Sequence, residues 1–565
     1  MAAHPRPEPD PAPGDAVPAG GRVRVARVQR SLPAFVRDLL ADRAAMRTLV
    51  VASAAIAAAG LDPHILDPGM PAMRSALAAD PALQGWFLLA AILQSGFILL
   101  GGFLADTLRS VRLLQIALLG LAVSSVAEAL TSSDAVLYLL RIVAWACDGV
   151  IITFAIGAVA ASTAGENRAT ALGVAYGVLG ATMAVAPALA IVLGEWGAAW
   201  PAFLACGTMS LIALRLTPRL PVRPPVDAVG RATMATVTLF AFGVVAFAAS
   251  AIDVTAPDQR IRDGGIAVGI VAMAGGLLLR LRGRGQHGTW IGFRPVTVAL
   301  GAGVVIGFAQ AAPLLHLPIF FEQIQGHPQL LAIAGIAPFV VALLIAGPLS
   351  GLLLERFRPR TLIAGGLVLV GVANLLLWEA LSRDMPYVSA IVPFVLIGAG
   401  FVIATTVRTA VIFANLPRGM PAIAAGFNEA SIGVGSRLGI VVATVVTMQV
   451  ALAATPVPRQ GGLIAAQPGL GESTIRELVL RIGLPGTRDL AAGLDQGAVA
   501  RAFDAIVGGM ATTELVLGLV AIATGIVAWL LMGRSDPVGS VWEYADERAG
   551  ADATPVPARP VEAAD

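Results

Sequence analysis

The chain has 565 residues, of which 57% are hydrophobic and 13% charged, and its formal net charge is only +2. Its mean hydropathy of +0.81 is far above that of a soluble globular protein, so the composition predicts a multi-pass membrane protein and offers no basic patch for nucleic acid. All of its basic residues are Arg. Without Lys the phosphate-binding loop of ATPases cannot form, so any pumping must draw on another energy source.

Fourteen stretches are long and apolar enough to cross a bilayer, for which a helix needs about 20 apolar residues. In chain order they cover residues 48–71, 84–105, 111–131, 135–160, 169–194, 197–216, 230–252, 264–282, 295–321, 328–354, 360–382, 386–413, 421–452 and 511–532. The sequence therefore predicts an all-α integral membrane protein with fourteen transmembrane helices.

The arginines indicate the orientation of these spans, because short cytoplasmic loops carry an excess of basic residues. With the N-terminus inside, the cytoplasmic segments hold most of the arginines, including Arg22 to Arg30, Arg215 to Arg223, Arg280 to Arg284 and Arg356 to Arg360. The opposite short loops hold few: Arg74, Arg260, Arg262 and Arg383. Both termini are therefore predicted to be cytoplasmic.

The spans divide the chain into five parts. Residues 1–47 and 533–565 are predicted to be cytoplasmic tails, and the first lacks the apolar core of a cleavable signal peptide. Residues 48–216 hold six spans, residues 217–294 hold two more with cytoplasmic linkers, and residues 295–532 hold the last six.

One loop on the predicted outer side is long. Residues 456–510 contain two amphipathic stretches, "STIRELVLRIGLPG" and "QGAVARAFDAIVGGM". A helical hairpin over the outer mouth is one interpretation, and a solvated insertion without a role in transport is the other.

Two predicted cytoplasmic loops repeat the same pattern of a Gly, an acid four residues later and a cluster of Arg. The first reads "GGFLADTLRSVR" and the second "SGLLLERFRPR". Their residues are Gly102, Asp106, Arg109 and Arg112, and Gly351, Glu355, Arg356 and Arg360. Gly permits close helix approach, and an acid in one half of the protein can bond to a group in the other half. The repeat therefore indicates a gate between two halves. A basic loop that only fixes topology is the alternative.

These motifs resemble those of the major facilitator superfamily, specifically its fourteen-helix drug:proton antiporter branch. "LDPHILDPGMP" is similar to the first-span signature, with Asp62 at its carboxylate position and His64 and Asp67 where Thr and Asn are usual. "LLRIVAWACDG" keeps the membrane arginine as Arg141. "APALAI" keeps the proline of the antiporter motif as Pro187, on a helix that also holds Gly180. The resemblance implies two six-helix bundles plus two extra helices.

Charged side chains within spans are costly, so each is a candidate for function. Asp62 and Arg141 are predicted at similar depth, and Asp148 follows Arg141 by two helical turns. This cluster suits proton coupling, because an acid that gains or loses contact with Arg can release or bind a proton. A static ion pair is the alternative.

A second group of polar residues forms the predicted substrate path. In the C-terminal half Arg408 and Glu429 are expected to pair, with Arg437 nearer the middle of the membrane. The remaining candidates are His64, Asp67, Gln94, Gln310 and His316. For Gln94, Gln310 and His316 an interhelical hydrogen bond is the simpler interpretation.

The sequence thus predicts a proton-coupled exporter of amphipathic small molecules in the cell's inner membrane. It is expected to be a monomer, and its expected partners are protons, a small-molecule substrate and the surrounding lipid. A lipid exporter of the same fold and a non-transporting receptor or scaffold are the alternatives. An enzyme is not expected, since no H-E-x-x-H or G-x-S-x-G element is present. The two cysteines, Cys147 and Cys206, lie in apolar runs, so neither a disulfide, a metal site nor a cofactor is expected.

Overall fold

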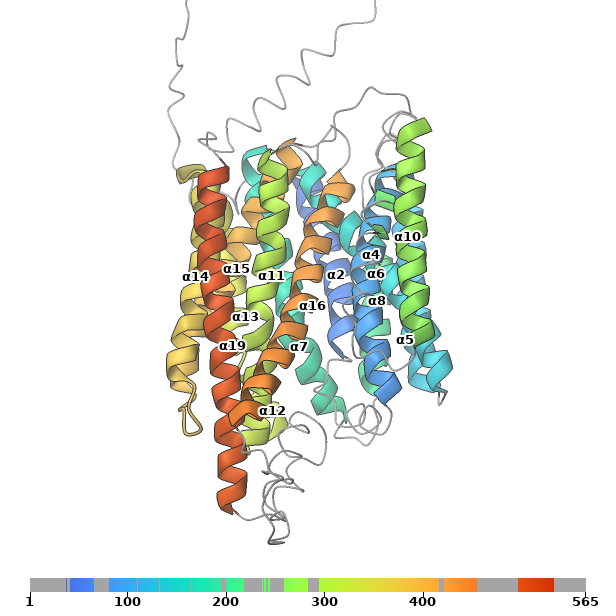
Figure 1. The fold of residues 1–565 in the computed structure, drawn as a ribbon. Coiled ribbons are helices and arrows are strands. Elements are labelled where there is room, and N and C mark those ends of the chain that lie inside the picture. The colour runs from blue at the N-terminus through green and yellow to red at the C-terminus, as the bar shows by residue number, and fades with distance from the viewer. Residues whose placement is uncertain are drawn as a thin grey trace, which may run out of the picture.

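The structure is a computed structural model. It describes residues 41–65, 81–108, 110–131, 133–163, 165–194, 200–217, 259–282, 294–415, 421–454 and 496–532, with the single residues Arg37, Thr236, Thr238, Leu239, Phe242 and Gly243. Regular structure in these ranges is entirely helical, and the helices stand side by side as a bundle (Figure 1). Nine of the described helical segments are long and apolar enough to cross a membrane.

The first six described helices form the N-terminal half. They are α2 (Arg43–Ile65), α4 (Pro81–Leu108), α5 (Val111–Leu130), α6 (Asp134–Ser162), α7 (Gly165–Gly194) and α8 (Trp200–Leu216). Their positions agree with the first six predicted spans within a few residues; for α2 the described part reaches Ile65, and residues 66–71 of the predicted span lie outside the described residues. Helix α10 (Gln259–Arg282) agrees with the eighth span, and residues 230–252, the predicted seventh span, lie almost wholly outside the described residues.

The remaining helices form the C-terminal half. They are α11 (Arg294–Ile319), the π-helical turn η3 (Phe320–Ile324), α12 (Gln329–Ala334), α13 (Ala337–Arg356), α14 (Pro359–Ala380), α15 (Val388–Asn415), α16 (Pro421–Ala454) and α19 (Gln496–Leu531). The count of fourteen spans and the cytoplasmic placement of both termini stay predictions.

Prolines explain two departures from the predicted spans. Helix α11 contains Pro313 and Pro318 and continues into the π-helical turn. The carbonyl oxygen of Ala309, to which Pro313 cannot donate, accepts instead from Asn374 Nδ2 at 2.8 Å. The predicted span 328–354 is divided into α12 and α13 at Gly335 and Ile336. Pro338 lies in the first turn of α13, where its missing N–H costs no hydrogen bond. A proline also disfavours helical backbone at the residue before it, so a new helix begins here more readily than the old one continues.

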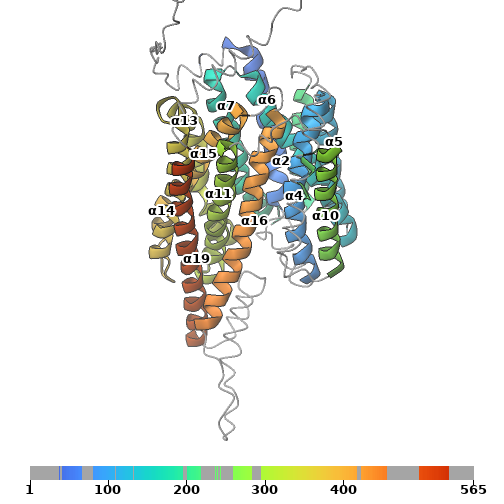
Figure 2. The ribbon, with the colours of Figure 1, turned by 45° about the horizontal axis from the view of Figure 1, so that its top comes forward.

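Helix α19 includes the last part of the long loop, and the hairpin as a whole stays a prediction. Residues 496–510, taken from sequence as the second arm of a hairpin, form the first part of one uninterrupted helix that runs to Leu531. No proline interrupts this stretch, and Gly509 allows α19 to lie directly against the backbone of Thr447 in α16. Residues 455–495 lie outside the described part. Helix α19 extends beyond its neighbours at the lower end (Figure 1), and the tilted view shows the lower end of α16 beside it (Figure 2).

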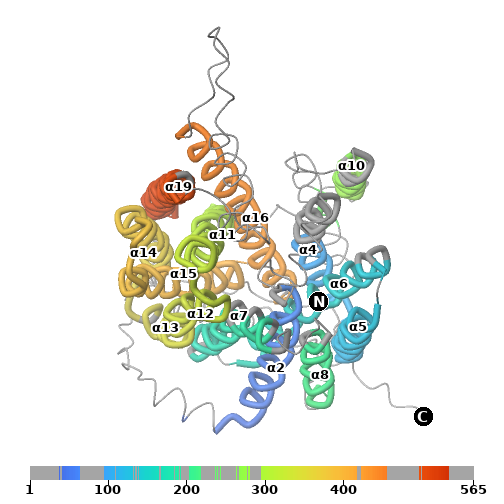
Figure 3. Tube along the Cα trace, turned by 90° about the horizontal axis from the view of Figure 1, so that it is seen from below, coloured from blue at the N-terminus to red at the C-terminus, as the bar shows by residue number. Residues whose placement is uncertain are grey.

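Five helices make the main contacts between the two halves. Helix α7 packs along α13, and α4 and α6 pack along α16. Seen from below, the two groups of helices lie on either side of this seam, and α10 stands apart beside α4 (Figure 3). Tilting the molecule shows α16 running between α11 and α4 (Figure 2). Phe242 touches Gly96 of α4 and Gly243 touches Met273 of α10, so these two residues lie between those helices.

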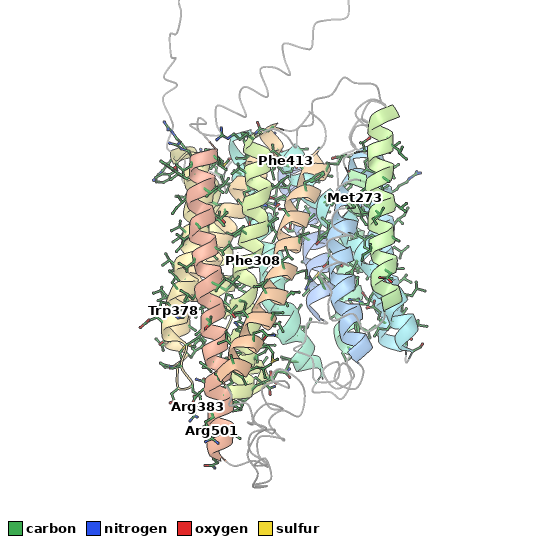
Figure 4. All side chains as sticks on the ribbon, in the orientation of Figure 1. Met273, Phe308, Trp378, Arg383, Phe413 and Arg501 are labelled. Carbon is green, nitrogen blue, oxygen red and sulfur yellow. The ribbon has the colours of Figure 1, made fainter. Side chains whose placement is uncertain are left out.

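The outer surface of the bundle is apolar, as contact with lipid requires. Large side chains such as Ile116, Val271 and Val388 are more than two-thirds exposed. Arg383 and Arg501 both lie at the lower end, below Trp378 (Figure 4). The charged residues inside the bundle are therefore the exceptions that need an explanation.

Candidate functional site

The most highly charged part of the interior surrounds Arg141 of α6, which is fully buried. Its Nη2 donates to Asp62 Oδ1 of α2 at 2.8 Å, and its Nε donates to Glu128 Oε1 of α5 at 2.7 Å. Nη2 also bonds to the second oxygen of Glu128. One arginine thus connects three helices of the N-terminal half through two carboxyl groups.

Aromatic and sulfur groups close the site around this arginine. The guanidinium carbon lies 6.0 Å from the ring centre of Trp145 and 5.7 Å from that of Phe203 of α8. The thiol of Cys206, also on α8, lies 3.7 Å from Asp62 Oδ1. The other oxygen of Asp62 is buried without a hydrogen-bond partner. Asp62 therefore has one oxygen fixed by Arg141 and one unused.

Asp148 completes the cluster from the same helix as Arg141. It is fully buried, and neither of its oxygens accepts a hydrogen bond from a donor group. Its neighbour is the carboxyl group of Asp62, so a hydrogen bond between these two needs a proton on one of them. Three carboxyl groups face one guanidinium. With all three ionised the site would carry two uncompensated negative charges in a dry interior, so the arrangement has room for protons.

The C-terminal half contains a second buried arginine, Arg408 of α15. Its Nη2 donates to Asn428 Oδ1 of α16 at 2.6 Å and to Ser431 Oγ at 3.1 Å. Its Nε and Nη1 have no hydrogen-bond partner. The predicted Arg408–Glu429 ion pair is not formed, because the side chain of Asn428 takes the position beside the guanidinium.

Glu429 instead belongs to a network that joins the two halves. Asn428 Nδ2 donates to Glu429 Oε1 at 3.0 Å and lies 3.0 Å from the hydroxyl oxygen of Tyr176. Tyr176 is on α7 of the N-terminal half, and it also lies 3.1 Å from Thr409 Oγ1 of α15. A tyrosine of one half thus contacts two helices of the other.

The first predicted gate loop makes a direct contact between the halves. Asp106 of α4 is buried, and its Oδ2 accepts a hydrogen bond from the backbone N–H of Ile423 at 2.7 Å. Ile423 is the third residue of α16, so the carboxylate occupies the place of a helix N-cap. Gly102 lies against the backbone of Ala422, where a Cβ atom would come within 2.6 Å of the carbonyl oxygen. Arg112 is exposed, and Arg109 lies outside the described residues.

The second loop meets the N-terminal half through its glycine. Gly351 lies directly against the backbone of Thr170 in α7. Arg356 is exposed, and the guanidinium carbon of Arg360 lies 4.7 Å from the ring centre of Trp529 in its own half. The side chain of Glu355 lies outside the described part. The two repeated loops thus contact the opposite half by different means.

The other predicted residues are distributed over several helices. Gln310 is buried with one oxygen unpartnered, Gln94 and Arg437 are half-buried, and Gly180 packs against Leu343 of α13. Pro187 lies within α7, and the backbone of His64 lies in α2. The side chains of both residues, and Asp67 entirely, lie outside the described part.

Sequence reasoning misses two buried acids. Glu128 lies two residues before the end of α5, and Glu514 lies near the middle of α19. Glu514 Oε1 is 3.0 Å from Nδ1 of His316 in α11. The absence of proline from 496–532 is the signal that could have placed Glu514 inside a long helix.

Comparison with known proteins gives a consistent family. A family model described as the Major Facilitator Superfamily matches residues 52–440. The uncharacterized MFS-type transporter EfpA of Mycobacterium tuberculosis is 26% identical over 369 residues, which cover 62% of this chain and 67% of that protein. The tetracenomycin C resistance and export protein of Streptomyces glaucescens is 24% identical over 412 residues, covering 70% and 74%. A triacylglyceride transporter of Mycolicibacterium smegmatis is 23% identical over 355 residues, covering 58% and 61%.

Solved structures show the same fold. The proton:xylose symporter XylE aligns with a TM-score of 0.52 and 12% identity, over 88% of this chain and 99% of that one. The POT family transporter PepTSo aligns with a TM-score of 0.53 and 15% identity, over 89% and 98%.

Proposed function

The chain belongs to the Major Facilitator Superfamily, and from that premise we propose that it is a proton-coupled exporter of amphipathic small molecules that works by alternating access. Members of this family are membrane transporters and not enzymes, and one of the relatives named above is a resistance and export protein. The proposal adds the direction, the coupling ion and the class of substrate.

The buried cluster of Asp62, Glu128, Arg141 and Asp148 is the observation that carries the proton coupling. A site with three carboxyl groups and one guanidinium changes its charge whenever a proton binds, and burial makes that change energetically large. Asp62 has an unused oxygen and lies beside Asp148, so it is the group that we assign to proton exchange. Arg141 holds the deprotonated form.

Alternating access is supported by the contacts between the halves. The Asp106–Ile423 hydrogen bond and the Tyr176 network lie toward the end where α4 finishes and α16 begins, and both contacts break if the halves separate there. By the distribution of arginines this is the cytoplasmic side. The structure then corresponds to a state closed toward the cytoplasm. We place the protein in the cytoplasmic membrane as a monomer.

One relative supports the proposed substrate class. The Streptomyces relative is a resistance and export protein for tetracenomycin C. A drug or a secondary metabolite of that character is the proposed cargo.

Transport in reconstituted liposomes tests the proposal. Ethidium is the probe, and an imposed proton gradient is the energy source. We expect gradient-driven ethidium movement in the wild type and its loss in Asp62→Asn, which keeps the shape of the side chain but cannot exchange a proton. Glu379→Gln, on the exposed face of α14, is the matched control and should transport normally. Gradient-driven movement that is unchanged in Asp62→Asn would contradict the assignment of Asp62.

A lipid exporter is the second candidate, because one relative is a triacylglyceride transporter. The same liposomes distinguish the two, with fluorescent triacylglycerol replacing ethidium. Movement of the lipid alone would favour the lipid exporter. If neither probe moves in vesicles that demonstrably hold a gradient, the exporter proposal fails and a receptor or scaffold role is favoured.

A further inference from the structure

The C-terminal half contains a buried acid–base pair that the proposed coupling site does not use. His316 of α11 and Glu514 of α19 are joined by the 3.0 Å contact between Nδ1 and Oε1, and their side chains are 3% and 0% exposed. The second carboxyl oxygen of Glu514 is buried and has no hydrogen-bond partner.

A chain of hydroxyl groups continues from the other ring nitrogen. His316 Nε2 lies 3.3 Å from Thr447 Oγ1 of α16, which lies 3.0 Å from Thr513 Oγ1 of α19. Thr513 in turn donates to the carbonyl oxygen of Gly509 at 3.0 Å. Each hydroxyl has a single hydrogen to donate. Because the hydroxyl hydrogen of Thr513 is donated to Gly509, Thr513 Oγ1 accepts a hydrogen bond from Thr447. Thr447 Oγ1 must then accept a hydrogen bond from Nε2 of His316. The chain therefore requires a hydrogen on Nε2.

This tautomer determines what the pair can hold. With Nε2 protonated, a hydrogen bond between Nδ1 and Oε1 needs one further proton, which sits either on the imidazole or on the carboxyl group. In both cases the pair is electrically neutral. Loss of that proton leaves a buried carboxylate facing the lone pair of Nδ1, which is unfavourable in a dry interior. The contact is thus built around one exchangeable proton.

The position of the pair corresponds to that of Asp62 in the other half. Asp62 lies in the last described turn of α2, and His316 lies in the last turn of α11, the first helix of the second bundle. Each is touched by the last helix of its own bundle, Asp62 by Cys206 of α8 and His316 by Glu514 of α19. The two halves of this fold are repeats, so equivalent places carry the two groups.

Other charged residues on the packed helices lie at least six residues from the pair along the chain, and on α11 and its π-helical turn these are Arg294 and Glu322. Helices α11, α14 and α16 pack against α19. On α16 the nearest charged residue is Arg437, about 15 Å from Thr447 along the helix axis. Helix α14 carries Arg360, which stacks on Trp529, and the exposed Glu379. On α19 Asp504 and Arg501 precede Glu514 by ten or more residues. Among the described residues, His316 is the one charged group that acts on Glu514.

We propose that His316 and Glu514 form a second proton-binding site, located in the C-terminal half, which holds one proton between Nδ1 and Oε1 and keeps the proton on Nε2 directed to Thr447. Each half of the transporter then has its own proton site near the same end of its first helix. The inference needs no substrate and does not depend on the exporter proposal.

Nitrogen NMR of the full chain, labelled with ¹⁵N-histidine and placed in lipid nanodiscs, tests the proposal. The chain has five histidines, and His316→Gln assigns the relevant signals. We expect Nε2 of His316 to carry a hydrogen and the Nδ1 signal to report a proton shared with the carboxyl group of Glu514. Glu514→Gln, whose amide group cannot hold that proton, should change the Nδ1 signal and leave Nε2 protonated. His327, half-exposed in the turn before α12, is the internal control.

Two results would overturn the proposal. If the Nδ1 signal of His316 matches that of an imidazole nitrogen with no shared proton, as judged against His327, the pair holds no proton. If the Nδ1 signal is the same in Glu514→Gln, the carboxyl group is not its partner. Should Glu514→Gln fail to fold, Thr447→Val is the second variant. It removes the acceptor of Nε2 and should shift the Nε2 signal while the proton at Nδ1 remains, and loss of that proton would count against the site.

Discussion

Asp106 of one half caps a helix of the other, because its carboxylate accepts the 2.7 Å hydrogen bond from the backbone N–H of Ile423. A carboxylate at a helix N-terminus satisfies an N–H group that has no partner within the helix, and it interacts favourably with the helix dipole. The bond crosses the seam between the halves, so its energy stabilises the closed arrangement specifically.

Asp106→Ala should therefore weaken closure at this end. Loss of a helix cap costs about 1 kcal/mol, which corresponds to roughly a fivefold shift toward the open arrangement. Hydrogen exchange of the first turns of α16 measures this change, and it should become faster. Thr107→Ala, on the neighbouring position of α4, is the control. Equal exchange in the two variants would show that Asp106 does not hold the halves together.

Tyr176→Phe should favour the open arrangement by a different route. Its hydroxyl group lies 3.1 Å from Thr409 and 3.0 Å from Asn428, both in the other half. Two hydrogen bonds of about 1 kcal/mol each predict a shift of roughly tenfold or more. Spin labels at the exposed positions of Arg112 and Arg356, one in each half, report the separation as a longer distance.

Tyr387→Phe provides the comparison for this experiment. Tyr387 bonds to the carbonyl oxygen of Gly335 within the C-terminal half, so removal of its hydroxyl group leaves the seam intact. The distance distribution of that variant should match the wild type. A distribution for Tyr176→Phe that also matches the wild type would remove the Tyr176 network from the gate.

Arg141→Met should lower the free energy of unfolding substantially, because it leaves Asp62, Glu128 and Asp148 buried without a cation. Breaking a buried pair by removing one partner costs about 3 to 5 kcal/mol. The double variant Arg141→Met/Glu128→Gln has one acid fewer and should recover part of the loss. Thermal unfolding of the purified variants measures both. A double variant that is less stable than the single one would show that charge imbalance is not the cause.

Hydropathy predicts the helices of this protein well, because bilayer thickness sets the length of an apolar span. The contact between Asp62 and Arg141 also follows from sequence, since residues at equal depth on neighbouring helices can meet. Sequence reasoning misses Glu128 and Glu514 because each lies near an end of its predicted span. Glu128 is close to the end of its predicted span, and Glu514 is close to the start of a span taken to begin at residue 511, whereas α19 begins at Gln496.

Side-chain choice is harder to predict than depth. Arg408 and Glu429 have suitable depths for an ion pair. Asn428, the residue before Glu429 on the same helix, instead accepts the hydrogen bond from the guanidinium group of Arg408. An amide next to an acid presents its own oxygen to the arginine, and only the rotation of α16 decides which of the two faces α15. Periodicity places a residue on a face to within about one-third of a turn, which does not separate adjacent residues.

Gly351→Ala should block closure without unfolding the protein. A Cβ atom at this position would overlap the backbone of Thr170 in the other half, and backbone atoms cannot move aside as a flexible side chain can. The overlap disappears when the halves separate, so the variant should accumulate in the arrangement that is open at this end and should lose gradient-driven transport. Gly365→Ala is the matched control, because a Cβ atom there meets no other atom within 4 Å. Spin-label distances between positions 112 and 356 should lengthen in Gly351→Ala and stay unchanged in Gly365→Ala. A normal distance and normal transport in Gly351→Ala would mean that this glycine is not part of the gate.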